Sequence, residues 1–126
     1  MKFLKNNLTL DLHEMNIKFS YIYRDAGNYK KYNQLVFANP NGIVLKEVQI
    51  RIKSCLIDEC WFRAYDWKVP DLHFKEYEWD SLTDHNWHEV ESIEETNDLA
   101  TEEGTIDDFL IKIKILNNLV TNKLSE

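Results

Sequence analysis

The stretch that decides the fold is IKFSYIYR, residues 17–24. Every second side chain in it is apolar or aromatic: Ile17, Phe19, Tyr21 and Tyr23. A period of two is typical of a β-strand with one buried face. The following DAGN segment, residues 25–28, favours a turn, because Asp and Asn side chains bond to nearby backbone and Gly tolerates a positive φ. A second apolar run at residues 34–38 then predicts an antiparallel partner strand.

The rest of the chain extends this hairpin into an α+β fold. Asn39-Pro40-Asn41-Gly42 ends the second strand, since Pro cannot donate to a strand ladder and both N-P and N-G mark turns. Apolar residues at helical spacing predict a helix over about 45–57, and Thr105 with Asp108 forms a capping box at the start of another, about 105–118. Further strands are expected at 60–62 and 87–93. The spacing of three between Trp87, Val90 and Ile93 leaves a helix open as the alternative for the last of these. We therefore expect an antiparallel sheet of about four or five strands with the two helices packed on one face.

Length and composition suit one domain. The chain has 126 residues, of which 44% are hydrophobic, enough for one core. Residues 1–14 are polar and precede the clean alternation, so we interpret them as an N-terminal extension of a single α+β domain over residues 15–126. Polar residues interrupt any apolar leader in that extension, and no run of about 18 apolar residues occurs. These features predict a cytoplasmic protein that does not engage a membrane.

The charge is concentrated in one block. Residues 76–111 hold thirteen acidic residues and no Lys or Arg, so the net charge of −7 combines a block at −13 with a remainder at +6. Such a block can form a hydrated face, present an anionic surface to a basic partner, or bind a hard cation such as Ca²⁺. Direct nucleic-acid binding is disfavoured, because it needs Lys and Arg to displace counterions.

The first candidate site is the aromatic turn after the decisive strand. Its candidate binding residues combine rings, one cation and polar side chains: Tyr23, Arg24, Asp25, Asn28 and Tyr29. Aromatic rings interleaved with Arg or Lys can stack on a base or on a peptide. The alternative is structural, with Tyr23 in the core, Arg24 and Asp25 paired at the turn, and Tyr29 at the edge of the hairpin.

The second candidate site is a His/Asp/Glu cluster. Its candidate metal ligands are His73, Asp84, His85, His88 and Glu89. Converging His nitrogens and carboxylate oxygens would suit a divalent metal such as Zn²⁺, Mn²⁺ or Fe²⁺. The alternative is that these histidines are hydrogen-bonded or surface residues, since no H-E-x-x-H motif occurs and no Cys lies nearby.

Nucleophilic catalysis has no motif in this sequence. The chain contains no G-x-S-x-G elbow, no phosphate-binding G-x-x-x-x-G-K-[ST] loop and no G-x-G-x-x-G fingerprint. Cys55 falls within the first expected helix and Cys60 beside Trp61, so neither is placed as an exposed thiolate. Two cysteines five positions apart are also too few for a disulfide scaffold.

Several blocks resemble, in the same order, those of a group of short bacterial proteins. The first is FSYIYRDAGNYK at residues 19–30, a Y-R-D-A-x-N-Y-K strand and turn. The others are VPDLHF at 69–74, DHNWHE at 84–89 with SIEET at 92–96, and TIDDFL at 105–110. The resemblance implies a compact stand-alone domain over about residues 15–115, with Met15 as a candidate natural start. It implies no activity and no catalytic residues.

These observations predict a non-enzymatic binding or regulatory protein that acts through its acidic surface or its aromatic turn, with a protein as its partner. The alternative is a metal-dependent hydrolase or nuclease that uses the His/Asp/Glu cluster. No cofactor is expected for the first of these functions, and a divalent metal is expected for the second.

Overall fold

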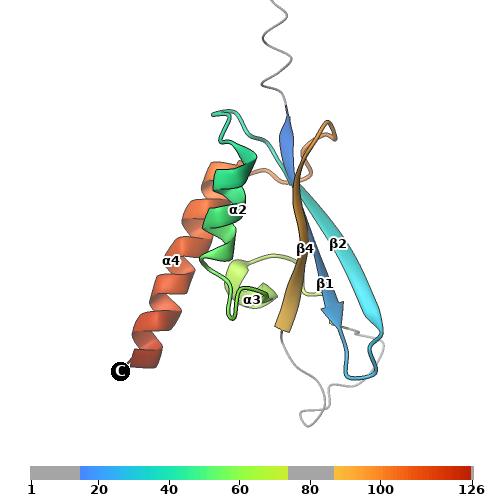
Figure 1. Cartoon of the computed structure of the whole chain (residues 1–126), viewed down its shortest axis with the longest axis vertical. Coiled ribbons are helices and arrows are strands. Elements are labelled where there is room, and N and C mark those ends of the chain that lie inside the picture. The colour runs from blue at the N-terminus through green and yellow to red at the C-terminus, as the bar shows by residue number, and fades with distance from the viewer. Residues whose placement is uncertain (1–14, 74–86, 126) are drawn as a thin grey trace, which may run out of the picture.

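Four antiparallel strands form a single curled sheet (Figure 1). The computed structural model describes residues 15–73 and 87–125. β1 (Asn16–Arg24) and β2 (Lys30–Phe37) form a hairpin, β4 (Trp87–Thr96) pairs with the other edge of β1, and β3 (Trp61–Arg63) pairs with β4. The strand order is therefore β2-β1-β4-β3.

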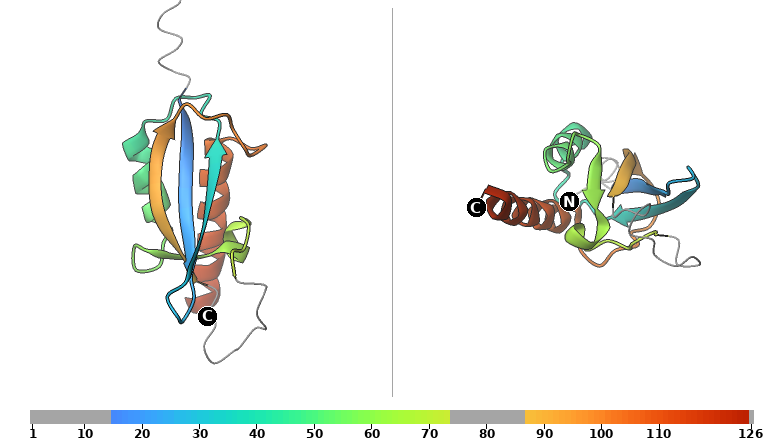
Figure 2. Two further views of the ribbon diagram at one scale, coloured as in Figure 1. Left: turned by 90° about the vertical axis from the view of Figure 1, so that its right-hand side faces the viewer. Right: turned by 90° about the horizontal axis from the view of Figure 1, so that it is seen from below.

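Three helices in the described part of the chain cover one face of this sheet, and none of them lies on the other face (Figure 1, Figure 2). They are α2 (Leu45–Lys53), α3 (Ala64–Trp67) and α4 (Ile106–Ser125). The expected α+β architecture, with an antiparallel sheet and the two long helices on one face, is thus confirmed. The single turn of α3 was not expected from the sequence.

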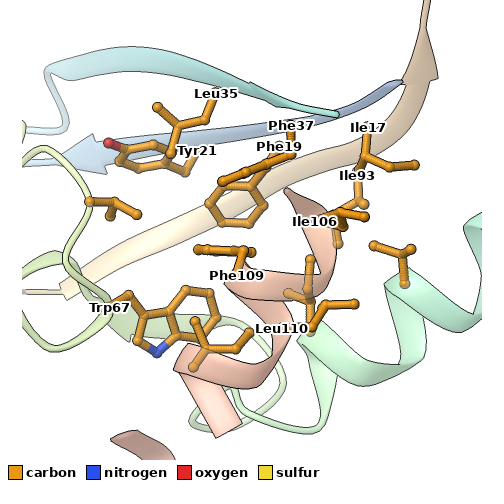
Figure 3. Close-up of a cluster of buried hydrophobic side chains, with 14 of the residues drawn as sticks. Ile17, Phe19, Tyr21, Leu35, Phe37, Trp67, Ile93, Ile106, Phe109 and Leu110 are labelled. Atoms are coloured by element: carbon orange, nitrogen blue, oxygen red, sulfur yellow. The ribbon is translucent and has the colours of Figure 1, made fainter. Parts of the chain in front are cut away.

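The core lies between the helices and the alternating apolar side chains of β1 (Figure 3). The ring of Phe19 lies 5.5 Å from that of Phe109 on α4, and Phe109 stacks on Phe37 of β2 at 4.6 Å. Ile17, Phe19 and Tyr21 are fully buried, as the period of two predicts. The alternate β1 residues, Lys18, Ser20, Ile22 and Arg24, lie on the opposite face, which we call the open face.

Two predicted local motifs are present. Asn39 closes the turn after β2: its side chain accepts from the Ile43 N–H (3.0 Å) and donates to the Ile43 carbonyl (2.9 Å), while Gly42 has a φ of 62°. At the start of α4, the Asp108 N–H donates to Thr105 Oγ1 (3.2 Å) and the Thr105 N–H donates to Asp108 Oδ2 (3.0 Å). This reciprocal pair is the expected capping box.

α2 is shorter than expected and α4 continues to the end of the described chain. α2 ends at Lys53 rather than near residue 57, because Ile57 turns to pair with Trp61. The Ile57 N–H donates to the Trp61 carbonyl at 2.8 Å, and the Trp61 N–H donates back at 2.9 Å. A helical Ile57 could not reach this edge of the sheet.

β4 shows why its sequence allowed two interpretations. Val90 pairs with Tyr21 and Ile93 with Phe19, so both side chains lie on the core face although they are three positions apart. The register shifts between these pairs, which leaves Glu91 as the extra residue of a β-bulge. Strand is therefore the correct interpretation, and the bulge produces the helix-like spacing.

Candidate functional site

The aromatic turn is a tightly bonded hairpin loop between β1 and β2. The Asp25 side chain accepts a hydrogen bond from the Tyr29 N–H at 2.8 Å, and the Asn28 N–H donates to the Asp25 carbonyl at 2.9 Å. The left-handed residue is Asn28, with a φ of 69°, and not Gly27 as the sequence favoured. Asn tolerates this conformation because its short polar side chain bonds locally, here by accepting from Arg24 Nη1 at 2.6 Å.

The five candidate residues of this turn separate into two environments. Tyr23 is fully buried on the core face, where its ring lies 5.1 Å from that of His88, so it cannot contact a ligand at the surface. Tyr29 is 72% exposed. Arg24, Asp25 and Asn28 are bonded to one another at the turn that joins β1 to β2, the lower end of the hairpin in Figure 1. Arg24 lies on the open face, opposite to Tyr23.

Arg24 makes a two-pronged ion pair with Glu89 of β4. Its Nε donates to Glu89 Oε2 at 2.9 Å and its Nη2 to Oε1 at 3.4 Å. The hydrogen bond to the carboxylate raises the pKa of the Arg24 guanidinium further above its usual value. The sequence assigned these two residues to different sites, and the structure joins them because β4 lies beside β1.

A pocket of about 430 Å³ surrounds this ion pair. Its walls come from the end of the open face, the turn before β3 and the turn after β1. The lining residues are Arg24, Asp25, Ile57, Asp58, Trp61, Trp87 and Glu89. Cavities of this size commonly hold small ligands or the anchor residues of a partner.

The sequence did not indicate Ile57, Asp58 or Trp61 as site residues. A usable signal was nevertheless present, because Asp58-Glu59 favours a turn and Trp61 follows it at the start of a strand. The turn is a tight one, with φ values of 52° at Asp58 and 61° at Glu59. It brings Asp58 over the open face, next to a tryptophan that is only half-buried.

His88 belongs to the core rather than to a surface site. It is 1% exposed and is surrounded by aromatic rings, with Phe62 at 5.8 Å and Tyr21 at 5.9 Å between ring centroids. Its Nε2 accepts a hydrogen bond from the Leu72 N–H at 3.1 Å. An imidazole nitrogen that accepts a hydrogen bond carries no proton, so the proton of neutral His88 is on Nδ1.

Asp71 lies near the same nitrogen, with its Oδ1 3.5 Å from His88 Nε2. This contact is an ion pair only in the protonated form of His88. The ring of His73, two positions after Asp71, forms a T-shaped contact with the ring of Tyr23, with centroids 5.5 Å apart.

The candidate metal ligands are only partly placed. His88 and Glu89 are consecutive on β4, so His88 lies on the core face and Glu89 on the open face, where it pairs with Arg24. The structure therefore does not bring these two side chains to one point. Asp84 and His85 lie outside the described residues. Within residues 15–73 and 87–125, no three His, Cys, Asp or Glu side chains gather as metal ligands would.

Both cysteines are free thiols. Cys55 is buried. Partial burial raises the pKa of the Cys60 thiol above its usual value, and the nearby Glu89 carboxylate adds to this effect. A thiol with a raised pKa is protonated at neutral pH, and it is the thiolate that acts as a nucleophile.

Seven of the nine described acidic residues of the block lie where β4 ends and α4 begins. We call the following set the acidic end: Glu94, Glu95, Asp98, Glu102, Glu103, Asp107 and Asp108. The second half of β4, the loop over residues 97–105 and the first turn of α4 carry them, at the upper end of the molecule in Figure 1. This end lies opposite the pocket, which sits where β4 starts.

Comparisons with protein-family models, with curated proteins and with solved structures found no match. The described helices include none with the length and apolarity needed to cross a bilayer.

Proposed function

We propose that the protein is a non-enzymatic cytoplasmic binding or regulatory module that recognises a basic protein partner through its acidic end. The observation that carries the proposal is that five of the seven carboxylates of the acidic end are exposed. Exposed carboxylates of one sign on one region create a field that attracts a basic surface and accelerates its association.

Internal pairing neutralises little of this charge. Lys18 Nζ lies 2.9 Å from Asp98 Oδ2, and its hydrogen bond lowers the pKa of that carboxyl. Asp107 accepts from the neutral Asn41 side chain at 2.7 Å, and Asp108 is used in the capping box. Neither of these contacts cancels a charge, so the region stays strongly anionic at neutral pH.

Two of these carboxylates favour the partner interpretation over a purely structural one. Glu95 and Glu103 are exposed, one on β4 and one in the loop that follows. On a surface that is only hydrated, acidic side chains are usually interspersed with basic ones. Residues 76–111 contain no Lys or Arg.

The test is affinity capture from a native lysate, with wild-type protein compared with the double variant Glu95→Gln/Glu103→Gln. The matched control is Glu47→Gln/Asp66→Asn, which removes the same charge from α2 and α3. We expect a basic partner that is captured by wild type and control, is several-fold depleted with the acidic-end variant, and is lost as salt rises. Equal capture by the two double variants, or capture that is insensitive to salt, would overturn the proposal.

A further inference from the structure

We propose that the pocket around Arg24 and Glu89 is a binding site for an arginine side chain of a basic protein segment. The proposal deepens the proposed function and rests on it, since it supplies a specific anchor for a partner that the acidic end attracts. The pocket lies where β4 starts, whereas the acidic end lies where β4 ends.

The sheet register builds the pocket floor. Trp61 pairs with Glu89 and Arg63 pairs with Trp87, which places all four side chains on the open face. Arg24 reaches the same surface from β1 through its bonds to Glu89. Two half-buried tryptophans therefore flank the half-buried carboxylate of Glu89 at the end of the sheet.

The charge of the lining favours a cation. Arg24 compensates Glu89, the more buried partner, whose side chain is 16% exposed. Asp25 and Asp58 then remain as two further carboxylates on the lining. Asp25 accepts a backbone hydrogen bond from Tyr29, which leaves its charge in place. The described lining residues thus carry a net charge of −2, opposite in sign to a basic segment. Arg63, which lies over the Trp87 ring beside them, has its own carboxylate partner in Asp66 at 3.7 Å.

The aromatic rings favour a guanidinium among the cations. Arg63 already lies over the Trp87 ring, with its Cζ 4.8 Å from the ring centroid. Tryptophan is the strongest aromatic partner for a cation, and arginine stacks on it while its N–H groups bond to a carboxylate. Trp61 offers a second indole in the same pocket, and Asp58 lies three positions before it in the chain.

The volume is sufficient for such an anchor. A pocket of about 430 Å³ is within the range that holds small ligands, so one arginine side chain enters it without rearrangement of the sheet. Arginine and tryptophan are also the residue types that most often carry the binding energy of a protein interface.

The experiment titrates the full-length protein with N-acetyl-arginine methylamide and follows the indole N–H signals by NMR. The neutral isostere N-acetyl-citrulline methylamide and the cation N-acetyl-lysine methylamide are the comparison probes. We expect the arginine probe to shift the signals of Trp61 and Trp87 but not that of Trp67, which is buried in the core. The citrulline probe should bind at least ten-fold more weakly, and the lysine probe several-fold more weakly.

Variants of the lining provide the second arm. Asp58→Asn should weaken the arginine probe several-fold, and Trp61→Leu should weaken it at least ten-fold. Because Trp61→Leu can disturb folding, Asp58→Asn alone is sufficient to test the site. The inference is overturned if the citrulline or lysine probe binds as well as arginine, if Asp58→Asn has no effect, or if the shifts fall on other residues.

The variant Glu95→Gln/Glu103→Gln separates this inference from the proposed function. It should leave binding of the arginine probe unchanged, because both residues lie far from the pocket, while it depletes the captured partner. Probe binding without any basic partner would contradict the proposed function alone. A basic partner whose capture survives Asp58→Asn and Trp61→Leu would contradict the pocket as its anchor.

Discussion

Arg24 Nε donates to Glu89 Oε2 at 2.9 Å, joining residues that are 65 positions apart in the chain. The pair links β1 to β4 on the open face, which none of the described helices covers. Arg24 also donates from Nη1 to the side-chain oxygen of Asn28 at 2.6 Å, which connects the pair to the turn after β1. The ion pair therefore organises the hairpin turn and the pocket floor together.

The first prediction concerns this pair. Glu89→Gln should lower the urea midpoint of unfolding, because one charge-assisted bond is replaced by a neutral one and Arg24 loses its counter-ion. The side chains are 36% and 16% exposed, so solvent screens the pair, and the loss should be smaller than that of the core variant Ile113→Ala. The double variant Arg24→Gln/Glu89→Gln should be less destabilised than the sum of the single variants. Additive effects would show that the two side chains do not interact.

The second prediction concerns the capping box of α4. Thr105→Ala removes the acceptor for the Asp108 N–H and should cost about 1 kcal/mol of unfolding free energy. Thr105→Ser keeps the hydroxyl and should retain most of the stability. Chemical denaturation of the three proteins decides the matter, and equal loss in both variants would mean that the methyl group rather than the cap is responsible.

Local patterns in the sequence predicted much of the fold because they arise from local physics. The alternation of residues 17–24 and the Thr105–Asp108 box each depend on neighbours only a few positions away, and both are confirmed. α2 ends earlier than expected because Ile57 pairs with Trp61. The helical spacing of apolar residues gives no information about such a pairing. The bulge at Glu91 likewise follows from pairing with β1 and not from β4 itself.

The candidate site could be predicted only in pieces, since it is assembled by the sheet order. Arg24 and Asp25 were identified as binding residues and Glu89 as a candidate ligand, but their contact requires β4 to lie beside β1. The strand pattern also separates His88 from Glu89 once β4 is known to be a strand. Trp61 and Asp58 join the pocket only because β3 is the edge strand next to β4.

The third prediction concerns the turn before β3. Glu59 has a φ of 61°, a conformation that costs a residue with a Cβ about 1 kcal/mol and glycine almost nothing. Glu59→Gly should therefore raise the unfolding free energy by up to about 1 kcal/mol, less the entropy that glycine adds to the unfolded chain. The control Glu95→Gly, in extended β4, should be destabilising. If Glu59→Gly lost as much stability as Glu95→Gly, the backbone of Glu59 would not be strained.

The fourth prediction uses the buried hydroxyl of Tyr21. It donates to the Pro70 carbonyl at 2.7 Å and accepts from Asn33 Nδ2 at 3.1 Å, tying the segment after α3 to the hairpin. Burial raises its pKa from 10.0 to about 12, with Glu102 and Asp71 adding to the effect and the Asn33 hydrogen bond opposing it. The folded state thus favours the neutral phenol.

Because the folded pKa is above the unfolded one, this contribution to stability is complete below about pH 10 and is lost as pH rises toward 12. Tyr21→Phe removes both the titration and the two hydrogen bonds, and should cost about 1–2 kcal/mol at pH 7. The difference in unfolding free energy between wild type and Tyr21→Phe should stay constant from pH 7 to 9.5 and shrink between pH 10 and 12. Comparing the two proteins cancels the lysines, whose titration they share. A difference that stayed constant through pH 12, or grew, would show that ionisation of Tyr21 is not linked to folding.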